Sequence, residues 1–221
     1  MGNIDYLKLT EITVKTQTEL DEIPLNFKGR IYIECGPNDW LQIRHNYHLP
    51  VVVNGNSTVV VCAFPGVVND FPDFPIVEAY GTSCVKVNGY SLVKAFDKST
   101  VEAFENSTVE AFDNSSVMAF DKSNVEAFED SFIAAYDDSS IRAFDNSSVK
   151  AFGNSLVRAF DNTFVEALAY SRVDAYDNSS VEADEYATIK AYANSSIKAF
   201  GNVQVVDFGA KIEISENARI V

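Results

Sequence analysis

Apolar and polar positions recur every eight residues from Val77 to about Phe208, in the form Val-x-Ala-Phe-Asp-Asn-Ser-x. When position 1 is counted from Val77, there are seventeen octads, and every first position is Val or Ile. Position 3 is Ala in fifteen octads and position 4 is aromatic in fourteen. A fixed period of this size is typical of a solenoid, in which each unit buries its apolar face only when neighbours stack on it.

Each octad predicts one strand followed by a turn. The β-branched residue at position 1 and the aromatic residue at position 4 suit a strand, and Asp-Asn-Ser at positions 5 to 7 suits a turn. Side chains alternate between the two faces of a strand, so positions 1 and 3 share one face and positions 2 and 4 the other. Position 2 is mostly charged, as in Glu78 and Lys94. We therefore expect positions 1 and 3 to form the interior.

The predicted interior is narrow, because it consists of Val, Ala and, past the turn, Ser. Small inward residues favour a thin coil of two octads, although a wider triangular coil of three octads stays open. Two octads per coil would give about eight coils spaced ~4.8 Å apart, a rod of about 40 Å. The predicted fold class is all-β, a parallel β-helix with caps at both ends.

We expect one domain in three parts. Residues 1–76 form an N-terminal cap and the first irregular coils, residues 77–208 form the octapeptide-repeat solenoid, and residues 209–221 form a C-terminal cap. Caps protect the unpaired backbone groups of the end coils.

The N-terminal part departs from the octad. Residues 18–23 predict one or two helical turns before Pro24. Glycine and prolines between residues 65 and 75 break the register, so residues 68–75 are expected to form an excursion loop or an interrupted coil, in which Phe71 and Phe74 either pack back or bind a partner. Short strands are expected at residues 31–35, 41–43, 51–53 and 59–61.

Composition limits the class of protein. The apolar fraction of 47% excludes a disordered chain, and no run approaches the ~20 apolar residues of a membrane-spanning helix. The first residues lack the features of a signal peptide. Three cysteines, Cys35, Cys62 and Cys84, have unrelated spacings and imply neither a disulfide framework nor a zinc site. We expect a soluble protein of the bacterial cytoplasm.

The chain is acidic, with a net charge of −15. Residues 1–76 carry nine acidic and five basic side chains, whereas residues 77–221 carry twenty-three and twelve. Most of the negative charge therefore lies in the repeats. It disfavours direct binding to nucleic acid or to an anionic membrane and favours basic partners or cations.

No catalytic constellation is visible. The only histidines are His45 and His48, with Cys35 and Asp39 nearby in the sequence, and this spacing does not by itself bring ligands to one face. The repeat contains many serines but no histidine that would activate one. We expect no enzymatic activity, no metal and no cofactor.

Position 5 gives the clearest candidate site. In a coil of two octads, residues sixteen apart stack, and one turn edge then carries an unbroken column of carboxylates. We call this column the acidic edge: Asp97, Asp113, Glu129, Asp145, Asp161 and Asp177. Like charges ~5 Å apart repel unless backbone amides, cations or a basic partner compensate them. Turn capping through backbone N–H bonds and binding of a basic protein are both compatible with this pattern.

Position 4 gives stacked aromatic residues on the same side of the coil. We call the following column the aromatic ladder: Phe96, Phe112, Phe128, Phe144, Phe160 and Tyr176. If the rings point outward, they form a larger apolar surface than soluble monomers normally expose, and they favour a homo-oligomer. If they turn into the corners, they belong to the core.

The repeats, together with Leu20-Asp21-Glu22-Ile23-Pro24, Gly29-Arg30-Ile31-Tyr32-Ile33-Glu34 and Gly201-Asn202-Val203-Gln204-Val205, resemble octapeptide-repeat proteins of bacteriophages and prophages. The resemblance covers most of the chain and implies a β-solenoid in a viral or bacterial cytoplasmic setting, without catalytic residues to carry over. At the level of architecture the chain is similar to acidic pentapeptide-repeat solenoids that mimic DNA, although its period is eight.

Three functional hypotheses follow. In the first, a non-enzymatic acidic β-solenoid binds a basic protein surface, for example that of a host nucleic-acid-handling or defence protein, as a phage-encoded inhibitor or DNA mimic. In the alternative, a structural module self-assembles through the aromatic ladder. The third and weakest is a surface protein that binds Ca²⁺ or carbohydrate.

Overall fold

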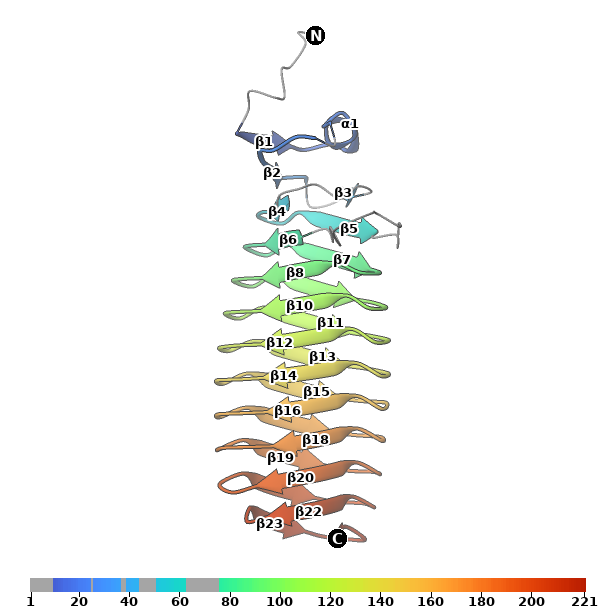
Figure 1. Cartoon of the computed structure of the whole chain (residues 1–221), viewed down its shortest axis with the longest axis vertical. Helices are drawn as coiled ribbons and strands as arrows, with labels where there is room; N and C mark the ends of the chain where they lie inside the picture. The colour runs from blue at the N-terminus through green and yellow to red at the C-terminus, as the bar shows by residue number, and fades with distance from the viewer. Residues whose placement is uncertain (1–9, 25, 37–38, 44–50, 63–75) are drawn as a thin grey trace.

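The computed structural model describes residues 10–24, 26–36, 39–43, 51–62 and 76–221, and this part of the chain is an all-β parallel solenoid of about 12 turns (Figure 1). The coils stack along one axis from β1 to the C-terminal strands, and each coil contributes one strand to each of two sheets. The predicted fold class is confirmed.

The strands of the 13-stranded sheet are, in spatial order, β1 (Glu11–Val14), β2 (Arg30–Ile33), β4 (Val51–Val53), β6 (Ile76–Ala79), β8 (Leu92–Ala95), β10 (Thr108–Ala111), β12 (Asn124–Ala127), β14 (Ser140–Ala143), β16 (Leu156–Ala159), β18 (Arg172–Ala175), β20 (Thr188–Tyr192), β22 (Gln204–Phe208) and β24 (Arg219–Ile220). The 11-stranded sheet contains β3 (Trp40–Ile43), β5 (Thr58–Cys62), β7 (Cys84–Asn88), β9 (Thr100–Ala103), β11 (Ser116–Ala119), β13 (Phe132–Ala135), β15 (Ser148–Ala151), β17 (Phe164–Ala167), β19 (Ser180–Ala183), β21 (Ser196–Ala199) and β23 (Lys211–Ile214).

The register decides the size of the coil. Val109 pairs with Val125 in the 13-stranded sheet and Val117 pairs with Ile133 in the other sheet, both in parallel and both sixteen residues apart. The coil of two octads is therefore correct, and the three-octad alternative is wrong. Small inward side chains permit this because the two sheets must approach closely across a thin interior.

The interior contains the residues that the alternation predicts. Val or Ile at position 1 and Ala at position 3 are fully or almost fully buried throughout the repeats, apart from Asp207 in the last octad. Serine at position 7 is buried beside them, and Ala187, Val203 and Thr163 replace it in three coils. Ten of these serine hydroxyls have no hydrogen-bond partner among the described residues. The core is thus apolar with two columns of small polar side chains.

The turns of the repeats share one conformation, except for the turn at residues 192–195, where the positive φ of 71° falls on Asn194 at position 6. The N–H of position 7 donates to the carbonyl of position 4, as from Ser147 to Phe144 at 3.2 Å. Position 5 has a left-handed backbone, with φ of 57° at Asp145 and 65° at Gly153, whereas position 6 of the same turns does not. A positive φ at the first central residue alone is the pattern of a type II′ turn, which normally favours glycine there.

The N-terminal end of the 11-stranded sheet is covered by α1 (Gln17–Asp21), on which the predicted helical turns fall. A capping box of Thr16 and Glu19 begins this helix. The side-chain amide of Gln17 accepts from the N–H of Gln42 at 2.7 Å and donates to the carbonyl of Gln42 at 3.1 Å. It therefore satisfies backbone groups at the edge of β3, as a neighbouring strand would.

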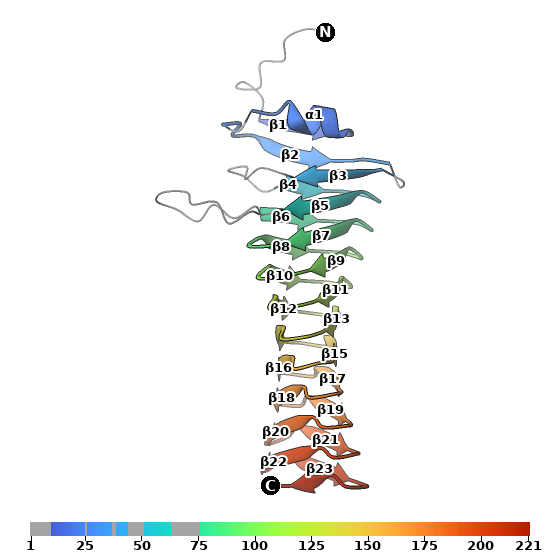
Figure 2. The ribbon, with the colours of Figure 1, turned by 90° about the vertical axis from the view of Figure 1, so that its right-hand side faces the viewer.

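The stack also twists about its long axis. In Figure 2 the strands near the two ends are seen more broadside, and those around β12 to β15 are seen nearly end-on. The excursion loop with Phe71 and Phe74, and the histidines His45 and His48, lie outside the described residues.

Candidate functional site: an acidic edge and an aromatic ladder

The acidic edge lies on the turns that follow the strands of the 13-stranded sheet from β8 to β18. Each carboxylate accepts a hydrogen bond from the backbone N–H of the position-5 residue one coil earlier. The N···O distances are 2.9 Å for Gly81 to Asp97, 3.0 Å for Asp97 to Asp113, 2.8 Å for Asp113 to Glu129, 3.2 Å for Glu129 to Asp145, 3.3 Å for Asp145 to Asp161 and 3.4 Å for Asp161 to Asp177.

These bonds extend the expected capping role. Sequence reasoning placed the capping bonds within the turns, and the structure shows them linking successive coils. They give the backbone N–H groups of the positive-φ residues a charged acceptor. The partial positive charge of each N–H group lies beside a carboxylate and lowers the repulsion between carboxylates along the column. The bonds use one oxygen of each carboxylate, and a carboxylate accepts at both oxygens.

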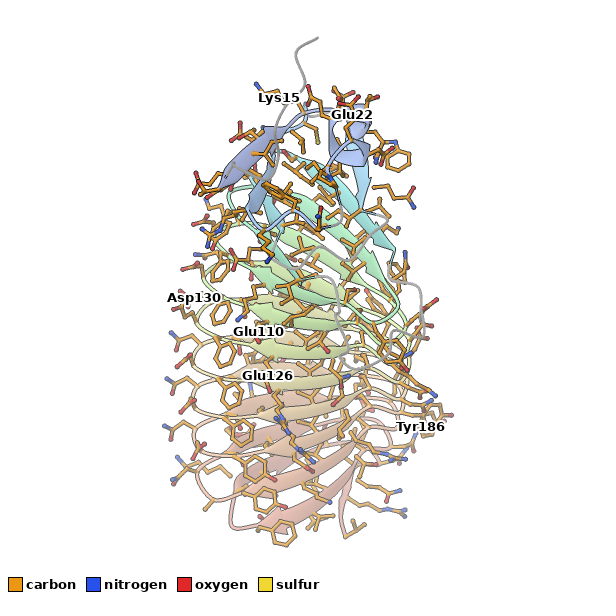
Figure 3. The ribbon with its side chains drawn as sticks, turned by 45° about the horizontal axis from the view of Figure 1, so that its top comes forward. Lys15, Glu22, Glu110, Glu126, Asp130 and Tyr186 are labelled. Atoms are coloured by element: carbon orange, nitrogen blue, oxygen red, sulfur yellow. The ribbon has the colours of Figure 1, made fainter. Side chains whose placement is uncertain are left out.

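Side chains at position 6 form a looser second column beside the acidic edge. Asn146 donates to Asp130 at 3.5 Å and Asn162 donates to Asn146 at 3.4 Å. Figure 3 shows Asp130 pointing out from this edge. The edge therefore presents carboxylates and amides to solvent, with Lys98 among them.

The opposite turn edge is less regular. The N–H of Glu105 donates to Asp121 at 3.1 Å and that of Asp121 donates to Asp137 at 3.4 Å, but Gly153 then replaces the carboxylate. Further along this edge, the rings of Tyr170 and Tyr186 stack at 5.3 Å. Tyr186 projects from the edge in Figure 3.

The rings of the aromatic ladder lie outside the core, at the ends of the strands of the 13-stranded sheet. Neighbouring rings stack nearly parallel at 5.0 to 5.2 Å, and the column continues to Tyr80 at one end and to Tyr192 and Phe208 at the other. The six ladder rings are half-buried. Their faces therefore cover one another, an arrangement between the two alternatives of full exposure and burial in the core.

Burial in this column raises the pKa of two of its phenols. Desolvation raises the pKa of Tyr80 and of Tyr176, and a hydrogen bond with Tyr192 raises the pKa of Tyr176 further. Both phenols are consequently neutral over the physiological pH range.

Outward side chains at position 2 form ion pairs between neighbouring strands. The pairs are Lys86–Glu102 and Lys150–Glu166 at 2.7 Å, Lys94–Glu110 at 2.8 Å, Glu126–Arg142 at 3.1 Å, Glu182–Lys198 at 3.4 Å and Arg158–Asp174 at 3.9 Å. Figure 3 shows Glu110 and Glu126 on the outer face of the sheet. Exposed pairs of this kind contribute about 1 kcal/mol or less each.

One surface was missed by sequence reasoning. On the outer face of the 11-stranded sheet, Met118 and Ala134 interrupt the charged column at position 2, and Phe132 is exposed beside them at position 8. The signal was present in the sequence as two uncharged residues at the mostly charged position 2 and a phenylalanine at position 8, all within seventeen residues. These residues could be recognised as one surface only from the strand register, which places Met118 beside Ala134 on neighbouring strands.

The described residues contain no group of three or more His, Cys, Asp or Glu side chains that could hold a metal ion. Cys35 is buried, and its thiol lies 3.6 Å from the carbonyl oxygens of Asp39 and Thr58. Within the same part of the chain no helix is long and apolar enough to cross a membrane.

Comparisons of the chain with protein-family models, with curated proteins and with solved structures find no match. The repeat solenoid with coils of about sixteen residues is therefore established by its own geometry.

Proposed function

We propose that this protein is a non-enzymatic acidic β-solenoid that binds a basic protein surface through the acidic edge. The observation that carries the proposal is the column of six carboxylates, one per coil, each held by a backbone N–H of the preceding coil. The hydrogen bonds restrict the carboxylates before a partner arrives, so that less side-chain entropy is lost on binding.

The geometry suits Lys and Arg side chains. One oxygen of each carboxylate is bound to the solenoid, and the other can accept from an ammonium or guanidinium group. With a net charge of −15, the chain also attracts a basic partner over a distance, and this attraction weakens with salt.

The finer form of the proposal is a phage-encoded inhibitor that occupies the nucleic-acid-binding surface of a host protein in the bacterial cytoplasm. The acidic edge carries one charge per coil, about 4.8 Å apart, whereas duplex DNA carries one per ~1.7 Å of its axis. A DNA mimic of this form would therefore present fewer charges per unit length than DNA does. This form rests on the resemblance to phage octapeptide-repeat proteins and on the acidic edge.

The test is a pull-down from a nuclease-treated bacterial lysate with a tagged chain. Asp113→Asn, Glu129→Gln and Asp145→Asn together remove three charges while keeping side-chain oxygens that accept the backbone N–H bonds. The matched control neutralises Glu105, Asp121 and Asp137 on the opposite edge, which changes the net charge equally. We expect the wild type and the control to recover a basic protein that the first variant loses, and equal recovery by all three would refute the proposal.

Two other hypotheses stay predictions. Binding of Ca²⁺ predicts that a chelator lowers the melting temperature, and carbohydrate binding predicts that a glycan ligand raises it. Self-assembly through the aromatic ladder predicts a concentration-dependent mass that Phe128→Ser reduces.

A further inference from the structure

The outer face of the 11-stranded sheet is uncharged at its centre. From β7 to β21 its position-2 column reads Lys86, Glu102, Met118, Ala134, Lys150, Glu166, Glu182 and Lys198. Only Met118 and Ala134 are uncharged, and the pairs Lys86–Glu102 and Lys150–Glu166 flank them on both sides at 2.7 Å.

Apolar side chains surround this centre. Phe132 is 39% exposed at position 8, and Met118, Phe120 and Tyr136 are half-buried. Ala134 is only 7% exposed and forms the low point between them. We call Met118, Phe120, Phe132, Ala134 and Tyr136 the apolar face.

We propose that the apolar face docks a second copy of this chain, with the long axes of the two solenoids antiparallel. The two copies are related by a two-fold axis that lies in the interface, parallel to the strands and midway between β11 and β13. Such an axis reverses the order of the coils and keeps each position of the octad opposite the same position. The contact is therefore between equal surfaces, as in most homodimers. This inference does not depend on the acidic edge, which lies on the turns and stays accessible.

Side-chain sizes are complementary under this axis. Met118 faces the partner's Ala134, so a long flexible side chain meets the low point of the opposite face. At position 8, Phe132 faces the partner's Ser116 in the same way. At position 4, Phe120 faces the partner's Tyr136, which brings aromatic rings together across the interface.

The flanking charges are complementary as well. Glu102 faces the partner's Lys150, and Lys86 faces the partner's Glu166. A parallel arrangement would instead place Lys86 against its own equivalent and Glu102 against its own. Unlike charges across an interface and like charges in the wrong arrangement both favour the antiparallel dimer.

The outer face of the 13-stranded sheet is less suitable. A two-fold axis between β12 and β14 would also oppose unlike charges, but every position-2 side chain from Glu78 to Lys190 on that sheet is charged, including Glu126 and Arg142 at the centre. Docking there would remove ion pairs from water at the middle of the contact, where interfaces are normally apolar.

The expected dimer is weak. The six strands from β7 to β17 are separated by five spacings of ~4.8 Å, and four residues along each strand extend ~3.3 Å apiece. They define a face of about 24 by 13 Å, which is below the area of a standard interface. The twist of the stack limits the contact further. We expect a dissociation constant on the order of 10 to 100 µM at about 0.15 M salt, where repulsion between two acidic chains is screened beyond ~8 Å.

Sedimentation analysis of the full chain from 1 to 500 µM tests the dimer, with two charge variants. Glu102→Lys alone opposes a new lysine to the partner's Lys150, and Lys150→Glu alone opposes two glutamates. We expect each variant to dimerise at least tenfold more weakly than the wild type. In an equal mixture, a mixed dimer contains one protomer of each variant, and both of its contacts between positions 102 and 150 join opposite charges. The mixed dimer should therefore form more tightly than the dimer of either variant alone.

Two controls separate the faces. Glu110→Lys and Arg158→Glu make the equivalent exchange on the 13-stranded sheet and should leave the dimer unchanged. Met118→Lys places a charge in the apolar face beside Glu102 and should abolish dimerisation while circular dichroism stays that of the wild type. The proposal would be overturned by a wild type that is monomeric up to 500 µM or by a mixture of the two charge variants that dimerises no more tightly than each variant alone. Loss of the dimer in the control pair would also overturn it.

Discussion

The carboxylate of Asp145 accepts a 3.2 Å hydrogen bond from the backbone N–H of Glu129, one coil earlier, and the two residues have φ values of 57° and 58°. Left-handed backbone costs roughly 1 kcal/mol or more for a residue with a side chain. The bond from Glu129 to Asp145 offsets this cost at Glu129, and the bond from the N–H of Asp145 to Asp161 does the same at Asp145. Each acidic residue therefore supports the left-handed backbone of the residue one coil earlier.

This relationship predicts the order of stability of three variants. Asp145→Asn keeps an acceptor and tolerates a positive φ, so its free energy of unfolding should stay within about 0.5 kcal/mol of the wild type. Asp145→Ala loses the bond and keeps the strain, and should cost about 1 to 2 kcal/mol. Asp145→Gly loses the bond but relieves the strain, and should fall between them. Urea unfolding measures the order, and equal effects of Ala and Gly would contradict the role of strain.

The buried serines predict a second contrast. The Oγ of Ser131 has no partner among the described residues, whereas that of Ser147, in the next coil of the same column, donates to the carbonyl of Phe144 at 2.7 Å. Ser131→Ala should be neutral or stabilise by up to about 1 kcal/mol, because it removes an unsatisfied hydroxyl. Ser147→Ala should cost about 0.5 to 1.5 kcal/mol. Thermal unfolding of the two variants measures the contrast, and an equal shift in both would contradict it.

The aromatic ladder predicts a stabilising role for each stacked ring. The ring of Phe144 stacks on Phe128 at 5.2 Å and on Phe160 at 5.0 Å. Phe144→Leu should cost about 1 to 3 kcal/mol, since two ring contacts worth roughly 0.5 to 1.5 kcal/mol each are lost. The reverse change, Leu168→Phe, adds a ring one coil after Phe152 and should stabilise by less than about 1.5 kcal/mol. Urea unfolding again provides the measurement, and a neutral Phe144→Leu would show that the rings stack without stabilising the coils.

Stability should fall at alkaline pH. Burial raises the pKa of the Cys84 thiol above its ordinary 9.0 and raises the pKa values of the Tyr80 and Tyr176 phenols above 10.0. The unfolded chain therefore releases these protons at lower pH than the folded chain, so their contribution is fully present below pH 9 and is lost as the pH rises through the folded values. The free energy of unfolding measured from pH 8 to 11 should decrease above about 9.

Matched variants identify the groups responsible. The double variant Tyr80→Phe, Tyr176→Phe should lose less free energy of unfolding per pH unit above pH 10 than the wild type. Cys84→Ser should lose less near pH 9. Tyr170→Phe, at an exposed ring, serves as the control. An unchanged slope in the first two variants would show that other groups cause the alkaline loss.

Much of the fold was predictable from local rules. Alternation along a strand places Val109 and Ala111 inside and Glu110 outside, because successive side chains point to opposite faces. The small size of those inner residues also favoured the thin coil. For the acidic edge, the same sequence identified which residues stack but left capping and partner binding as alternatives.

The sequence by itself determined the strand and turn in each octad and the two faces of each strand, because these depend on neighbours within eight residues. Tertiary structure decided three further features, namely the pairing at sixteen residues, the bond from Glu129 to Asp145, and the half-burial of the aromatic rings. It also placed Met118 beside Ala134 on one face. Contacts of this kind depend on how far apart consecutive coils lie and how they are aligned, and the whole stack sets both quantities.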